Sequence, residues 1–245
     1  GTKRYKEYLV YWKEARISWQ RIKELNRLGG PIGIQMSVEI ASFAGASLML
    51  GWGGESWDST SALAANQVMV SLANLIYMFY VGTGNAIAIR VANYHGLNDL
   101  HGVRSAAHAG FQMIMLMGIV ASTVVFGFRH DISSLFISDA DPEMLLRVSQ
   151  IVAVTAIPLI LYQFGDGMQT AYVNALRGYG DVKVLMKYSF LAYIVISMPV
   201  SYLFGIAMDW GCLGIWMGYP FGLTTVAILY LMRFRRVTSK HGQCQ

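Results

Sequence analysis

Six long apolar stretches dominate the sequence and restrict what the chain can fold into. They run approximately over residues 30–51, 62–90, 104–127, 147–175, 186–208 and 213–232, and a helix needs about 20 apolar residues to cross a bilayer. Only 13% of the 245 residues are charged, 55% are hydrophobic, and the mean hydropathy is +0.43. Backbone groups in lipid must be paired within the chain, so such spans are helical. The sequence predicts an all-α, polytopic membrane bundle of six transmembrane helices.

The basic residues are distributed unequally between the two sides of the predicted membrane. Of the 19 Lys and Arg residues, only Arg129 and Arg147 fall outside the N-terminal segment, the second and fourth loops and the C-terminal tail. By the positive-inside rule both termini are cytoplasmic, as an even number of spans also requires. We expect a multi-pass protein of the plasma (inner) membrane. Residues 1–29 would be a cytoplasmic amphipathic linker helix, 30–232 the membrane bundle and 233–245 a cytoplasmic basic tail.

Several function classes find no support in the sequence. The net charge of +5 reflects basic loops that set topology, so we expect contact with membrane lipids and not with nucleic acid. Cys212 and Cys244 fall on opposite sides of the predicted membrane and cannot pair. No P-loop, nucleophile elbow or zincin motif occurs, so we expect neither an enzyme nor an ATP-driven pump, and no cofactor. The chain begins with Gly and its first 29 residues do not resemble a signal peptide, so we expect a fragment of a longer protein.

One acidic residue, Glu39, falls in the middle of the first apolar stretch. A carboxylate at bilayer depth costs about 2.5–3.5 kcal/mol on insertion scales, and such residues usually serve a function. Gln35 and Ser42 lie three or four residues away and therefore share a helix face with Glu39. We expect this polar face to line a cavity. The alternative is that Glu39 is a hydrogen-bonded acid that only holds helices together.

A second acidic residue, Asp166, lies in the fourth stretch. Tyr162 and Gln169 share its helix face, and Asn174 lies two turns further along. Lys and Arg occur only near the ends of the spans, so neither acid has an evident fixed counter-charge. Buried acids without a counter-charge need protons or a mobile cation. The pair therefore indicates cation-coupled transport, provided that both acids face one cavity.

Asparagine side chains recur in the second stretch at helical spacing. Asn66, Asn74 and Asn85 fall close to one face of the predicted helix. They either line a polar pathway or hydrogen-bond neighbouring helices together, and the sequence does not decide between these roles.

Four segments in this order resemble the C-terminal half of a MATE (multidrug and toxic compound extrusion) transporter. They are Gly-Pro-Ile-Gly at 30–33 ahead of Glu39, Ala-Leu-Ala-Ala-Asn-Gln at 62–67, Gly-Thr-Gly-Asn-Ala at 82–86, and Tyr162-Gln163 ahead of Asp166 with Leu-Arg-Gly-Tyr-Gly-Asp at 176–181. The resemblance covers residues 20–236. It implies that this chain is the second of two six-helix lobes, and that the N-terminal lobe of the same polypeptide is missing.

The resemblance also implies an activity and a site. Such proteins export amphipathic cationic small molecules in exchange for Na⁺ or H⁺, and their second-lobe cation site matches Glu39, Asp166 and Tyr162. The sequence does not choose between the two ions. One alternative is a lipid-linked oligosaccharide flippase or polysaccharide exporter of the same superfamily, against which the acidic interior argues. Others are a non-transporting half-lobe and a membrane enzyme using both acids, although no nucleophile motif or metal-ligand cluster accompanies them.

Overall fold

The computed structural model describes residues 18–52, 57–136 and 142–240, and the regular elements in these ranges are helices. In chain order they are α2 (Trp19–Gly51), α3 (Ser59–Gly96), α4 (Leu100–Phe128), α5 (Ile132–Phe136), α6 (Pro142–Tyr179), α7 (Lys183–Ser189), η2 (Phe190–Ser197), α8 (Met198–Tyr202), η3 (Leu203–Ala207) and α9 (Gly211–Lys240). Six helices are long and apolar enough to span a membrane, with α7 to η3 forming one of them, Lys183–Ala207. Each predicted span maps onto one of the six, which confirms the predicted six-helix membrane bundle.

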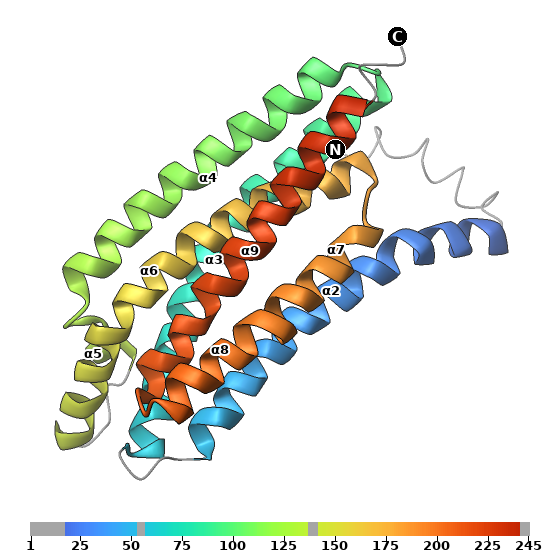
Figure 1. Cartoon of the computed structure of the whole chain (residues 1–245). Coiled ribbons are helices and arrows are strands. Elements are labelled where there is room, and N and C mark those ends of the chain that lie inside the picture. Colours follow the sequence, from blue (N-terminus) through green and yellow to red (C-terminus); the bar gives the residue numbers. More distant parts are fainter. Residues whose placement is uncertain (1–17, 53–56, 137–141, 241–245) are drawn as a thin grey trace, which may run out of the picture.

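The six long helices alternate in direction along the bundle (Figure 1). The start of α2 and the end of α9 therefore lie at the same end, as an even number of spans requires. In Figure 1, α3, α6 and α9 form the middle of the bundle, α4 lies on one side, and α2 with the α7–α8 helix lies on the other. The hydrophobic core is built mostly from the middle helices, with Tyr80, Leu159 and Trp216 among its fully buried side chains.

The first and last long helices extend past the predicted span boundaries. α2 begins at Trp19 and continues through Pro31 without a break, so residues 19–29 belong to the same helix as the first span. α9 likewise continues to Lys240, so residues 233–240 prolong the last span. Cys212 is buried. Cys244 belongs to residues 241–245, which, like residues 1–17, are outside the described ranges.

Prolines have different effects in three of the spans. α6 and α9 remain helical through Pro158 and Pro220. The fifth span instead contains two π-helical stretches, η2 and η3, on either side of the short α8 that holds Pro199. A π-helical stretch changes the register of the helix faces and is often found at functional sites. Among these three prolines, the interruption of α-helical geometry is found around Pro199.

Small residues bring α9 close to the fifth span. Gly214, Gly218 and Gly222 lie along one face of α9, and a Cβ at any of them would collide with backbone of the fifth span. The close approach lets serines donate hydrogen bonds across the interface, from Ser201 Oγ to the carbonyl of Ile215 (2.8 Å) and from Ser197 Oγ to that of Gly218 (3.0 Å). The three glycines, spaced four residues apart, therefore form a helix-packing face.

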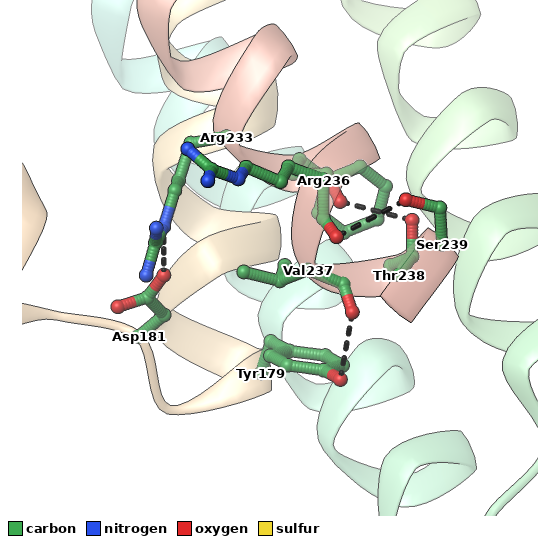
Figure 2. Close-up of polar contacts among 8 residues, drawn as sticks. Tyr179, Asp181, Arg233, Arg236, Val237, Thr238 and Ser239 are labelled. Atoms are coloured by element: carbon green, nitrogen blue, oxygen red, sulfur yellow. Dashed lines mark hydrogen bonds and ion pairs between the residues drawn. The ribbon is translucent and has the colours of Figure 1, made fainter. Parts of the chain in front are cut away.

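The link between α6 and α7 is fastened to the end of α9 (Figure 2). Gly180 adopts φ +85°, a left-handed conformation that ends α6. The next residue, Asp181, then accepts an ion-paired hydrogen bond of 2.6 Å from Arg233 Nε. Tyr179, at the last turn of α6, donates to the carbonyl of Val237 over 3.3 Å. These contacts fix the end of the bundle at which both described chain ends lie.

Aspartates cap the second and third spans. Asp58 accepts from the amides of Thr60 and Ser61 (both 3.1 Å) and from Ser61 Oγ (2.6 Å), and Asp99 accepts from the amide of Gly102 (2.9 Å). The Ser61 hydroxyl and the two amides hold the pKa of Asp58 below its usual value. Local capping therefore sets where α3 and α4 begin.

Candidate cation-coupling site

Two glutamine side chains hold the carboxylate of Glu39. Gln35 Nε2, one turn earlier on α2, donates to Glu39 Oε1 over 3.0 Å. Gln169 Nε2, from α6, donates to the same oxygen over 2.6 Å. Both contacts are donations to an acceptor, and donors stabilise negative charge on a carboxylate. Glu39 Oε1 therefore has two donors, one from its own helix and one from α6.

A hydrogen-bond donor on each amide oxygen fixes the orientation of the two glutamines. Arg177 donates from its guanidinium to Gln35 Oε1 over 3.0 Å, and an arginine can only donate. Tyr193 donates its hydroxyl proton to Gln169 Oε1 over 2.9 Å. Since each amide oxygen is occupied by a donor, each amide nitrogen must face Glu39. The chain of contacts Arg177–Gln35–Glu39–Gln169–Tyr193 thus connects α2 and α6 with η2 of the fifth span.

Arg177 corrects one expectation from the sequence. The acids were expected to lack a fixed counter-charge, because Lys and Arg occur only near the ends of the spans. Arg177 does lie near the end of α6, yet its side chain reaches Gln35 and so lies two hydrogen bonds from Glu39. A fixed positive charge therefore accompanies Glu39, and the question of a missing partner concerns Asp166.

Asp166 is buried on α6, with 4% of its surface exposed. Its Oδ2 atom has no hydrogen-bond partner among the described residues. One turn earlier, Gln163 is 1% exposed, and neither its Oε1 nor its Nε2 has a partner in the same part of the chain. Buried polar groups are almost always paired, so unpaired ones call for an explanation. Sequence reasoning did not select Gln163, although its three-residue spacing from Asp166 was a usable signal.

Glu39 contacts α6 close to the position of Asp166 on that helix. Gln169, which contacts Glu39, follows Asp166 by three residues, and residues at this spacing are neighbours on a helix surface, about 5–6 Å apart at Cβ. Glu39 therefore approaches α6 within one turn of Asp166. The structure thus brings together Glu39 with Gln35 and Asp166 with Gln169, two pairs that the sequence placed on separate helices.

Tyr162 stands in an aromatic cluster beside this site. Its ring packs edge-on against Phe43 (centroids 6.2 Å apart), Trp216 (5.9 Å) and Tyr219 (6.1 Å). These rings come from α2, α6 and α9, and Tyr219 also donates to the carbonyl of Ser42 over 3.4 Å. Tyr162 precedes Asp166 by four residues on α6, so it connects the aromatic cluster to the turn that carries Asp166.

The remaining polar candidates lie in different surroundings. Asn66 donates to Ser47 Oγ (3.1 Å) and accepts from Trp216 Nε1 (3.0 Å), so it joins α2, α3 and α9. Asn174 is buried and donates to the carbonyl of Thr170 in its own helix (2.9 Å). Asn85 is exposed on α3, away from these contacts. The amides of the second span therefore do not share one environment.

The free polar atoms suit a small hard cation or a proton. Oxygen ligands from carboxylates and amides are those that hard cations prefer. Asp166 Oδ2 and Gln163 Oε1 are two such atoms within one turn of α6. In the described ranges no group of three His, Cys, Asp or Glu side chains is placed to hold a metal ion.

Comparison with known proteins identifies the family. The MatE family model matches residues 31–203, which is most of the membrane bundle. The chain belongs to the MatE family. The match includes both acids of the site, since Glu39 and Asp166 fall within the matched residues.

Relatives and solved structures agree with this assignment. The chain is 30% identical over 229 residues to the multidrug resistance protein NorM of Photobacterium profundum, and 34% identical over 224 residues to a probable multidrug resistance protein NorM of Xanthomonas axonopodis pv. citri. Each alignment covers 91% of this chain and 46% of the relative. This MatE chain thus spans about half the length of the curated relatives it matches.

The fold of the MatE chain matches solved MATE structures. A MATE crystal structure in complex with MaL6 superposes with a TM-score of 0.83 at 13% identity, covering 94% of this chain and 50% of that one. The eukaryotic MATE transporter AtDTX14 gives 0.80 at 22% identity, with 93% and 50% covered. The six-helix bundle therefore corresponds to about half of these transporters.

Proposed function

We propose that this chain is one lobe of a secondary active exporter of amphipathic organic cations, driven by antiport of Na⁺ or H⁺. Its relatives are named as multidrug resistance proteins, which supports transport of diverse small molecules. The acids Glu39 and Asp166 within the bundle suit a path for positively charged compounds. The two carboxylates also disfavour a flippase for pyrophosphate-linked sugars, because they would repel a pyrophosphate.

The contrast between the two acids carries the proposal. Glu39 has two donors on one oxygen, whereas Asp166 has a buried oxygen with no partner among the described residues. A proton or Na⁺ at Asp166 would supply the missing partner, and Glu39 within one turn would attract it. Binding and release at Asp166 would then change the charge of the lobe interior. An ion couples to transport only if its affinity differs between the two conformations of the carrier.

A second lobe and a defined orientation belong to this proposal. The curated relatives are about twice as long as the part that matches, so we place an N-terminal six-helix lobe of the same polypeptide against this one. Secondary transporters built from such repeats bind substrate between them and alternate access across the membrane. The basic end of the bundle would face the cytoplasm, in the inner membrane, with both termini on that side.

Efflux of a fluorescent organic cation such as ethidium tests the proposal. Cells would carry the complete polypeptide that contains this chain, in its native form, with Asp166→Asn, or with Asp209→Asn. Asp209 is an exposed acid in the turn before α9 and serves as the matched control. We expect Asp166→Asn to abolish efflux and Asp209→Asn to leave it unchanged.

The driving ion is read from the same assay. Efflux that stops on removing Na⁺ identifies Na⁺ antiport, and efflux that stops with a protonophore in Na⁺-free medium identifies H⁺ antiport. Equal efflux by the native protein and Asp166→Asn would remove Asp166 from the coupling site. No efflux by the native protein would reject organic cations as the substrate class.

A further inference from the structure

A groove lies between α4 and α9 at the end of the bundle where both described chain ends meet. Its volume is about 450 Å³, and α6 contributes Tyr172 to its lining. Arg104 and His108 line it from α4, and Arg235 lines it from α9. The residues that line the groove take no part in the proposed transport site, although Tyr172 follows Asp166 by six residues on α6.

The polar part of the groove carries positive charge. Arg104 and Arg235 are both exposed, His108 adds a third basic side chain, and among the described residues no acidic one lines the groove. Arg104 donates to the carbonyl of Thr238 over 2.7 Å, which fastens the start of α4 to the end of α9. A guanidinium has five N–H donors, so this contact leaves Arg104 able to bind an anion.

The rest of the groove is apolar. Tyr172 and Phe234 pack with ring centroids 6.0 Å apart, and Leu231 lies one turn before Phe234 on α9. Further from the bundle end, Phe111 of α4 packs on the same Tyr172 ring with centroids 5.6 Å apart, and α9 exposes Ile228 three residues before Leu231. The groove thus has basic groups at the bundle end and an apolar continuation toward the membrane interior.

We propose that this groove binds an anionic phospholipid, with the headgroup phosphate between Arg104 and Arg235 and an acyl chain along the apolar side chains that continue from the groove on α4 and α9. The order of basic and apolar groups fits an amphipathic ligand better than a free anion. Basic pockets between membrane helices on the cytoplasmic side bind such headgroups. The positive-inside rule assigns this end to the cytoplasmic leaflet, in which anionic lipids are found. The lipid phosphate bridges α4 and α9, in addition to the contact from Arg104 to Thr238.

Two adjacent arginines give a matched test. Arg235 lines the groove, whereas Arg236 does not, and in Figure 2 the side chain of Arg236 extends toward Arg233. Native mass spectrometry of the purified complete polypeptide, titrated with palmitoyl-oleoyl phosphatidylglycerol, measures lipid affinity. We expect Arg235→Ala to weaken binding about five-fold, as one lost basic contact predicts, and Arg236→Ala to leave it unchanged. Arg235→Lys, which retains the charge, should restore most of the affinity and shows that the fold is intact.

Competitors distinguish the possible ligands. Palmitoyl-oleoyl phosphatidylcholine, a zwitterion, should bind at least five-fold more weakly than the anionic lipid, and millimolar inorganic phosphate should not displace the lipid. Displacement by phosphate would identify a free-anion site and overturn the proposal. Equal losses for Arg235→Ala and Arg236→Ala, or no loss for either, would also overturn it.

Discussion

Gln169 Nε2 lies 2.6 Å from Glu39 Oε1, although 130 positions separate the two residues in the sequence. This hydrogen bond joins the first and fourth spans at the level of the proposed cation site. It also places Glu39 beside the helix turn that carries Asp166. A glutamine that donates to one acid and neighbours the other can make the site sensitive to movement between α2 and α6.

Replacement of Gln169 by Leu should weaken the site without removing either acid. A hydrogen bond to a charged group contributes about 1.5–3 kcal/mol, so its loss should lower the efflux rate at limiting ion concentration at least about ten-fold. The measurement is the initial rate of ethidium efflux against ion concentration. Gln112→Leu, an exposed glutamine on α4, is the control. Equal rates for both variants would show that the contact to Glu39 has no part in coupling.

Gln163→Met should make the protein more stable and less well coupled. Burial of an amide without partners costs about 1–3 kcal/mol, so an apolar side chain of similar volume removes that cost. The same change removes Oε1 as a ligand next to Asp166, and the ion concentration for half-maximal efflux should rise about ten-fold. Thermal unfolding in detergent and efflux titration measure the two effects.

The unfolding temperature of Gln163→Met decides whether the native amide is unpaired. If Gln163→Met lowered the unfolding temperature, the native amide would have to be paired, and its role as an ion ligand would lose its basis. Gln112→Met, made in parallel, reports what the same substitution does at an exposed position.

The spans were predictable from the sequence because apolar length is a local property. Glu39 and Asp166 were recognisable for the same reason, as charges inside such stretches. Arg177 was misjudged because a position near the end of a span does not show how far a long side chain reaches inward. The environment of Asn66 could not be read either, because Trp216 comes from a helix 150 positions away.

Asn66 and Asn85 should respond differently to the same substitution. Asn66→Leu breaks contacts to Ser47 and Trp216 and leaves the indole N–H buried, which should cost about 1–2 kcal/mol. Asn85→Leu changes an exposed residue and should leave the unfolding temperature unchanged. Thermal unfolding of both variants in detergent makes the comparison. Similar unfolding temperatures would mean that Asn66 does not hold the helices together.

Gly218→Ala should destabilise the bundle, contrary to the usual gain from replacing glycine in a helix. A Cβ at Gly218 would collide with Ser201 Oγ and with the backbone of Ser197 and Ser201, and overpacking of this kind costs about 1–3 kcal/mol. The control is Gly127→Ala, near the end of α4, where a Cβ has nothing within 4 Å. That change should be neutral or stabilising by up to about 1 kcal/mol, because alanine favours the helix. Opposite shifts of the unfolding temperature would support the close packing of α9 on the fifth span. Shifts in the same direction would mean that the two helices can separate at little cost.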